Sequence, residues 1–112
     1  MLAQKYRLSK QSDFKLIFQQ GKKIFGPFFI IRYLPNNLEN SRFTVIVSNK
    51  ISKKATVRNK IKRQLREIIR LNLSKFKYNN DIIITVLSAA VKEDYLNLEK
   101  NYLELLKKYK LV

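Results

Sequence analysis

Hydrophobic side chains return every three or four positions in three stretches of the chain, the spacing that places them on one face of a helix. The predicted helices span about residues 10–20, 55–73 and 92–109. Ser9 is a candidate N-cap of the first helix, and Gly21 follows its end, where a left-handed backbone is common. The apolar stripes expected to dock the helices are Phe14, Ile17 and Phe18; Val57, Ile61, Leu65, Ile68 and Ile69; and Tyr95, Leu98, Tyr102, Leu105, Leu106 and Tyr109.

Three other stretches have the composition of β-strands. They span about residues 28–34, 42–48 and 82–88. The first two are rich in aromatic and β-branched residues and are separated by the turn formers PNNLEN, so we expect them to form an antiparallel hairpin. In the second strand, Phe43, Val45 and Val47 share the face that is expected to meet the core. The third is apolar without interruption, which indicates a strand buried on both faces.

The predicted order α-β-β-α-β-α corresponds to an α+β fold, a two-layer sandwich of helices on a small sheet. The chain has 112 residues, two Gly, two Pro and no internal repeat, so we expect residues 1–112 to form a single domain. Its apolar runs are shorter than the roughly 20 residues that cross a bilayer, and its start does not resemble a secretory signal. A cytoplasmic protein with no membrane partner is the expectation.

The residue inventory argues against an enzyme with its own active site. The chain contains no Cys and no His, which excludes thiolate zinc sites and histidine-based catalysis. Asp13, Asp81 and Asp94 lie far apart in the sequence and lack the spacing of a paired-acid or metal site. We therefore expect no catalytic residue and no metal ligand in the protein, and an outright nuclease is disfavoured.

Charge points to a polyanionic partner. Lys and Arg total 24 against 8 Asp and Glu, a formal net charge of +16, which favours binding to nucleic acid. The charge is concentrated in KKATVRNKIKRQLREIIR, residues 53–70, where cations flank the apolar stripe of the second helix. Arg58, Lys62 and Arg66 are predicted to form one row, because residues four apart stack on one helix face. A helix bound inward by its stripe would present this row to a phosphate backbone, although a merely solvated face is the alternative.

The same segment resembles a known family. The pattern V-S-x-K…A-x-V-R-N-x-I-K-R-x-x-R-E begins at Val47, and an upstream match, RL…DF…IF..G, begins at Arg7. Together they are similar to the protein subunit of bacterial ribonuclease P, over nearly the whole chain. Within the motif, Lys60 replaces an Arg; before it, Thr44 stands where Gly is common after RF. Lys60 keeps the charge but loses the bidentate geometry of a guanidinium.

The resemblance implies a fold and a role. The fold would be ribosomal protein S5 domain 2-like, with a mixed sheet and a left-handed βαβ crossover. The protein would be the non-catalytic subunit of an endoribonuclease. One protein per RNA would bind the catalytic RNA subunit and precursor tRNA and support removal of the 5′ leader. Mg²⁺ would be held chiefly by the RNA. The candidate ribozyme-binding residues are Lys50, Lys53, Lys54, Arg58, Asn59, Lys60, Lys62, Arg63, Arg66 and Arg70.

A second set of residues is implied for the leader. In similar proteins the sheet and the first helix form a cleft for this single strand, which places Phe14, Phe18, Ile30 and Arg32 as candidates. Aromatic rings suit base stacking, and Arg32 suits phosphate, yet Phe14 and Phe18 also fit a core stripe and Arg32 a plain surface charge. Size, charge and fold suit a small structural ribosomal protein equally well, so that function remains the alternative.

Overall fold

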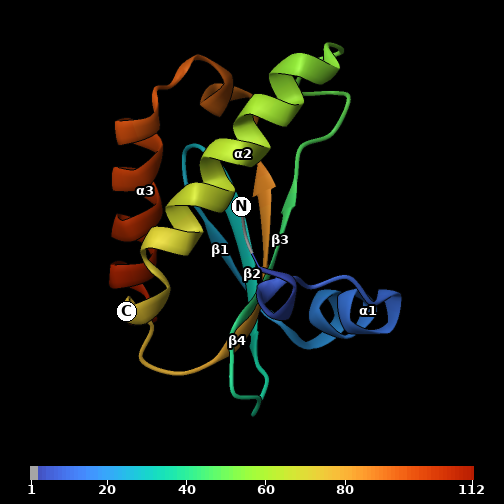
Figure 1. Cartoon of the computed structure of the whole chain (residues 1–112), viewed down its shortest axis with the longest axis vertical. Helices are drawn as coiled ribbons and strands as arrows, with labels where there is room; N and C mark the ends of the chain where they lie inside the picture. Colours follow the sequence, from blue (N-terminus) through green and yellow to red (C-terminus); the bar gives the residue numbers. More distant parts are fainter. Residues whose placement is uncertain (1–2) are drawn as a thin grey trace.

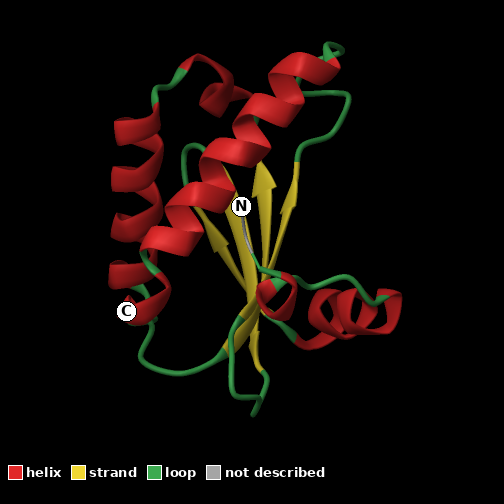
Figure 2. Ribbon diagram, viewed as in Figure 1, coloured by secondary structure: helices red, strands yellow, loops and turns green. Residues whose placement is uncertain are grey.

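The computed structural model describes residues 3–112 and shows a four-stranded sheet with helices on both faces (Figures 1 and 2). In chain order the elements are the short 3-10 helix η1 (Gln4–Tyr6), α1 (Gln11–Gln20), β1 (Lys22–Phe25), β2 (Phe29–Pro35), β3 (Arg42–Ile46), α2 (Ala55–Leu71), η2 (Leu73–Lys75), β4 (Asn80–Val86), η3 (Ser88–Lys92) and α3 (Tyr95–Lys108). The predicted α+β sandwich with a mixed sheet is confirmed. In the described part of the chain, no helix is long and apolar enough to cross a membrane.

The sheet order is β1-β2-β4-β3, with β4 antiparallel to β2 and parallel to β3. The predicted hairpin between β2 and β3 is therefore wrong, because β4 lies between them and pairs with both. The hairpin partner of β2 is instead β1, a four-residue strand that the pattern did not reveal. The crossover from β3 through α2 to β4 is left-handed: with β3 pointing up and α2 in front, β4 lies to the left of β3 (Figure 1).

Alternation along the strands divides the buried residues between two faces. Ile82 and Ile84 of β4 belong to the main core under α2 and α3, together with the buried stripes Ile61, Leu65, Ile68, Ile69 and Leu98, Tyr102, Leu105, Leu106. Ile83 points to the other face, where it packs with Leu8 and Ile17 beneath α1. Phe43 of β3 and Val47, just after its end, are buried in the main core, and Val45 packs against it, as predicted. Burial of β4 on both faces is confirmed.

Helix α1 ends where its backbone passes close to the sheet. A Cβ placed on Gly21 would lie 2.5 Å from the carbonyl oxygen of Ile17 and 3.1 Å from that of Tyr33, so only glycine fits. Its φ of −70° is extended rather than left-handed, contrary to the prediction. The N-cap is Lys10, which makes no side-chain cap hydrogen bond, rather than Ser9. Close approach, and not turn geometry, accounts for this glycine.

The third helix begins later than its hydrophobic pattern indicated. The side chain of Asp94 accepts a hydrogen bond from the backbone amide of Asn97 at 2.8 Å and caps α3, while Ser88–Lys92 forms the separate η3. Of the predicted stripe, Tyr109 is 41% exposed, so the end of the stripe does not belong to the core. Capping chemistry set a boundary that periodicity alone placed too early.

Candidate nucleic-acid interface

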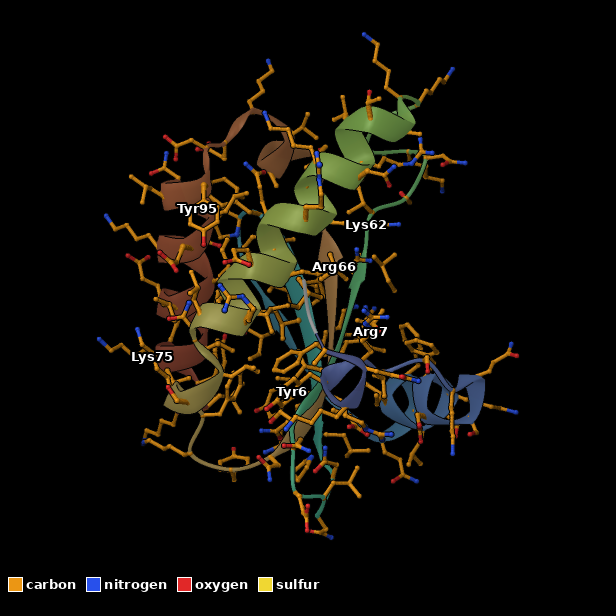
Figure 3. The ribbon with its side chains drawn as sticks, in the orientation of Figure 1. Tyr6, Arg7, Lys62, Arg66, Lys75 and Tyr95 are labelled. Atoms are coloured by element: carbon orange, nitrogen blue, oxygen red, sulfur yellow. The ribbon has the colours of Figure 1, made fainter. Side chains whose placement is uncertain are left out.

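Helix α2 is amphipathic in the way the pattern predicted. Its stripe packs in the core, and its other side carries cations to the surface. Figure 3 shows Lys62 and Arg66 extending from the same side of the helix toward the side on which Arg7 lies. We call Asn59, Lys62, Arg63 and Arg66 the α2 surface; together with Thr56 and Glu67 they line one shallow groove. This surface presents amide, ammonium and guanidinium donors, the groups that bind phosphate and sugar oxygens.

Arg58 does not continue this row, contrary to the prediction. Its guanidinium donates to the backbone carbonyl of Ser52 at 2.9 Å, which turns the side chain back to the loop before the helix. There it lines a second depression with Asn49, Lys50 and Lys53. Three predicted RNA-binding cations, Lys50, Lys53 and Arg58, are thus brought together at the N-terminal end of α2, where the helix dipole also favours an anion.

The remaining predicted cations of this region have separate surroundings. Lys54 is the exposed N-cap residue of α2, and Lys60 is exposed on the helix but lines neither depression. Arg70 donates to both carboxylate oxygens of Glu67, with one distance of 3.0 Å. These hydrogen bonds hold the pKa of Glu67 below its usual range and raise the pKa of Arg70. Arg70 is therefore partly neutralised, and it is a weaker candidate than Lys62 or Arg63.

The candidate leader residues divide between core and surface. Phe14 is partly buried against Leu8, Ile17 and Ile83, so its first role is to dock α1. The ring of Phe18, by contrast, is 52% exposed, although both side chains were assigned to one stripe. Sequence periodicity distinguishes a helix face but not the depth of a residue at the edge of that face.

Phe18 lies beside Arg32 of β2. The guanidinium of Arg32 sits 4.7 Å from the centre of its ring and also reaches the hydroxyl of Thr85 at 3.5 Å. Ile30 alternates with Arg32 onto the same face and pairs across the hairpin with Phe25, which is 65% exposed. We call Phe18, Phe25, Ile30 and Arg32 the open sheet face. Phe25 was missed from the sequence, because KKIF is too short and too polar to indicate a strand with an exposed aromatic ring.

A partly buried ion network attaches α1 to this side of the sheet. Arg42 donates to both oxygens of Asp81, at 2.8 and 2.6 Å, and its other amino group lies 3.3 Å from the carboxylate of Asp13. The amide of Asn36 also donates to Asp81 at 2.9 Å. The hydrogen bond to Asp81 is the largest influence that raises the pKa of Arg42. Asp13 and Asp81, which are distant in sequence, thus both contact Arg42, whose charge offsets theirs.

The contacts of Asp13 and Asp81 limit their possible part in metal binding. In residues 3–112 no group of three or more acidic side chains is positioned to hold a metal ion. The Asp13–Arg42–Asp81 network instead has a mechanical role, because it joins α1, which carries Phe18, to β3 and β4. The strand that carries Arg32, β2, pairs with β4. The arrangement can bind an anionic polymer on two surfaces.

Comparison with known proteins gives one consistent family. The family model described as Ribonuclease P matches residues 2–110. The chain is 37% identical over 108 residues to the ribonuclease P protein component of Syntrophomonas wolfei, covering 96% of this chain and 90% of the relative. It is 48% identical over 77 residues to that of Fusobacterium nucleatum, covering 69% and 68%.

Solved structures agree with the sequence relatives. The RNase P protein of Staphylococcus aureus superimposes with a TM-score of 0.86 at 29% identity, covering 95% of this chain and 96% of that one. The RNase P protein of Thermotoga maritima superimposes with a TM-score of 0.83 at 33% identity, covering 91% and 96%. At this coverage the likeness extends over nearly the whole fold rather than over the motif alone.

Proposed function

The chain belongs to the ribonuclease P protein family, whose role is the 5′ maturation of tRNA, and from this premise we propose that it performs that role by binding RNA on two surfaces. The α2 surface, with the Lys50–Lys53–Arg58 depression beside it, would hold the catalytic RNA subunit. The open sheet face would hold the single-stranded leader of precursor tRNA. The family relationship favours this function over a structural ribosomal protein.

The observation that carries the proposal is the two-sided character of α2. Its apolar stripe is anchored in the core, so the helix cannot rotate, while Lys62, Arg63 and Arg66 line an outer groove in which Glu67 is the only acid. Binding an RNA backbone would relieve the mutual repulsion of these cations and release counterions from the RNA. Each guanidinium can form two parallel hydrogen bonds with a phosphate.

The protein would leave bond cleavage to its RNA partner. Asp13 and Asp81 are committed to Arg42, and Glu67 to Arg70, so these carboxylates are poorly suited to activate water or to hold a catalytic metal. We propose that Mg²⁺ is held chiefly by the RNA subunit, that one protein binds each RNA, and that the complex works in the cytoplasm. The protein is then a non-catalytic subunit of an endoribonuclease.

Reconstitution tests the proposal. The purified protein alone is expected to leave precursor tRNA intact, and the RNA subunit alone to cleave it poorly at low Mg²⁺. Together they are expected to cleave it at the 5′ end of the mature tRNA, because the bound protein neutralises phosphates that Mg²⁺ would otherwise have to screen. Mg²⁺-dependent cleavage by the RNA-free protein would place the active site in the protein, and failure to stimulate the RNA would refute the proposed role.

A further inference from the structure

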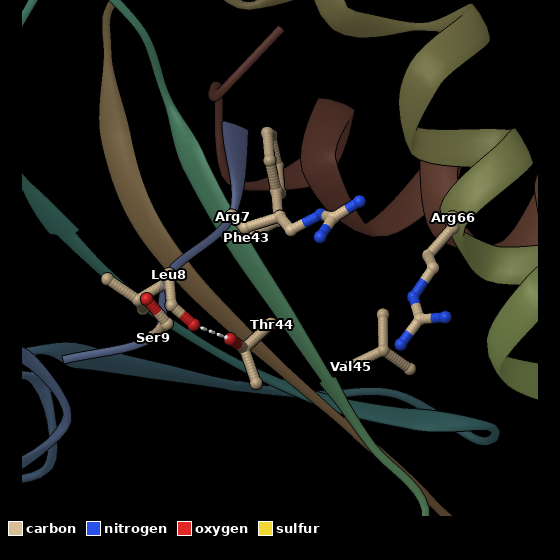
Figure 4. Close-up of a pocket in the computed structure, with 7 residues that line it drawn as sticks. All are labelled: Arg7, Leu8, Ser9, Phe43, Thr44, Val45 and Arg66. Carbon is tan, nitrogen blue, oxygen red and sulfur yellow. Dashed lines mark hydrogen bonds between the residues drawn. The ribbon is translucent and has the colours of Figure 1, made fainter. Parts of the chain in front are cut away.

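The N-terminal segment runs along the outer edge of β3 in a fixed register. Arg7 and Phe43 form a parallel β-bridge, and the backbone amide of Leu8 donates to the Phe43 carbonyl at 2.8 Å. The Thr44 hydroxyl in turn donates to the Leu8 carbonyl (Figure 4). Leu8 is itself buried, so the backbone beside Arg7 is held from both sides. The Arg7 side chain therefore leaves the sheet edge in a set direction.

A cavity of about 250 Å³ lies where this segment, β3 and α2 meet. Figure 4 shows the guanidinium groups of Arg7 and Arg66 extending into the same space from opposite sides. Phe43 and Val45 form its apolar wall, and Ser9 and Thr44 contribute hydroxyl groups. The guanidinium groups of Arg7 and Arg66 thus converge on one partly enclosed site.

The side chains that line this cavity favour an anion. None of the lining residues is acidic, and among residues 3–112 the Arg66 side chain has no hydrogen-bond or ion-pair partner. Two guanidinium groups that share a site repel each other, and an anion placed between them removes that repulsion. Arginine is also the side chain whose planar fork best matches the oxygens of a phosphate.

The size and position of the cavity limit which ligands it can hold. The volume lies below the roughly 300–1,000 Å³ of pockets that enclose small molecules, and it equals about eight shares of liquid water at ~30 Å³ each. It therefore suits one phosphate group better than a nucleotide base. Arg66 also lines the groove of the α2 surface, whereas Thr44 alternates with Phe43 onto the side of the sheet that faces α1. The cavity sits at the edge where the two faces of the sheet meet.

We propose that Arg7 and Arg66 together bind one phosphodiester of an RNA strand at the edge of β3. This contact joins the open sheet face to the α2 surface, so that an RNA passing from one to the other is held at the turn. The inference rests on the proposed function and adds to it a phosphate site and a residue, Arg7, outside both surfaces. The phosphodiester belongs either to the leader or to the RNA subunit, which offer the same chemistry.

The test uses R7Q, R66Q and the double variant, with K100Q on α3 as a control for the removal of one exposed cation. Dissociation constants are measured against salt concentration in two arms: the protein with the RNA subunit, and the assembled complex with leader-bearing precursor tRNA. In the arm that supplies the phosphate, each single variant is expected to weaken binding roughly ten- to hundredfold and to lower the salt slope by about 0.7–0.9. The double variant is expected to bind only slightly more weakly than either single one, because both side chains bind the same group.

Chemical substitution of the RNA identifies the source. Leader phosphates are replaced one at a time by neutral methylphosphonates. If the leader supplies the group, one position weakens binding to the wild-type complex but not to the R7Q complex. If the RNA subunit supplies it, a methylphosphonate at any leader position changes binding equally for the wild-type and R7Q complexes. The weakening caused by R7Q is then seen only with the RNA subunit. Either outcome supports the site.

Other outcomes overturn it. Effects that add in the double variant would mean two separate binding points, and unchanged affinity in both arms would mean that the cavity binds no RNA. Melting curves of R7Q that match those of the wild type exclude a folding defect, and R7K, which keeps the charge without the fork, is expected to recover part of the affinity. If the wild-type protein fails to stimulate the RNA, the proposed function fails; if it succeeds and R7Q behaves identically, only the phosphate site fails.

Discussion

The guanidinium of Arg32 lies 4.7 Å from the centre of the Phe18 ring, so a cation–π contact joins the central part of β2 to the last two turns of α1. Both groups remain available to a ligand, because the Phe18 side chain is 52% exposed and Arg32 is half-buried. A base that stacks on the ring would bring its phosphate within reach of the guanidinium. The pair therefore offers the two contacts that single-stranded RNA requires.

Phe18→Ala is expected to weaken binding of leader-bearing precursor tRNA by about 1–3 kcal/mol, the contribution of one stacked base. Binding of mature tRNA, which lacks the leader, should be unchanged, and the free energy of unfolding should change little because the ring is exposed. The measurement compares both RNAs bound to the assembled complex. Leu96→Ala, at a side chain that is 72% exposed on α3, is the matched control. Equal weakening for both RNAs would show that Phe18 does not contact the leader.

Lys62→Gln and Arg63→Gln should lower the affinity for the RNA subunit and reduce its salt slope by about 0.7–0.9 for each phosphate that the variant no longer binds. Thermal stability should hold or rise, because the substitutions remove repulsion from the α2 surface. Arg58→Gln should behave differently, since it also breaks the 2.9 Å hydrogen bond to Ser52 and loosens the loop before α2. Melting temperatures measured beside salt titrations separate the two cases. An unchanged salt slope would mean that the α2 surface faces only solvent.

Arg42→Met should lower the free energy of unfolding by about 2–4 kcal/mol, because the buried carboxylate of Asp81 would keep, among residues 3–112, only the Asn36 amide as a side-chain partner. Arg70→Met, which breaks the exposed pair with Glu67, is the control and should change stability little. Denaturant unfolding of both variants gives the comparison. If the two variants were equally stable, the Asp13–Arg42–Asp81 network would not be what holds α1 on the sheet.

The sequence predicted best what depends on neighbouring residues. The stripe of α2 and the double-sided burial of β4 follow from periodicity, which reports how each position is buried locally. The motif beginning at Val47 identified the family and most of the α2 surface. These features needed no knowledge of how distant segments pair.

What the sequence did not reveal depends on long-range contacts. The β2–β3 hairpin was expected because the two segments are adjacent in sequence, but β4 displaced β3 from β2. Arg58 lies outside its predicted row because its guanidinium donates to the carbonyl of Ser52 in the preceding loop. Asp13 and Asp81 lie close together because both contact Arg42. In the sequence Arg7 is only part of a motif, whereas in the structure its bridge to β3 places it opposite Arg66. Such convergence of distant residues has no periodic signal.

Tyr102→Phe should change how stability depends on pH. The side chain is fully buried, and its hydroxyl has no hydrogen-bond partner among the described residues, so desolvation raises its pKa above the ordinary value of 10.0. Below about pH 10 both the folded and the unfolded state keep this proton, and the group contributes no pH dependence. Above about pH 10 the unfolded state loses the proton that the folded state retains, so stability falls as pH rises, by up to about 1.4 kcal/mol per pH unit.

The variant removes this alkaline destabilisation and also the unsatisfied hydroxyl, so it should be about 1 kcal/mol more stable near neutral pH and the difference should widen above about pH 10. Tyr95→Phe is the comparison, because burial raises the pKa of that partly exposed residue too, and its effect should be smaller. Urea unfolding of the wild type and of both variants at about pH 7 and about pH 11 gives the free energies to compare. Parallel shifts of Tyr102→Phe at both pH values would show that the buried hydroxyl ionises equally in both states, contrary to its position in the core.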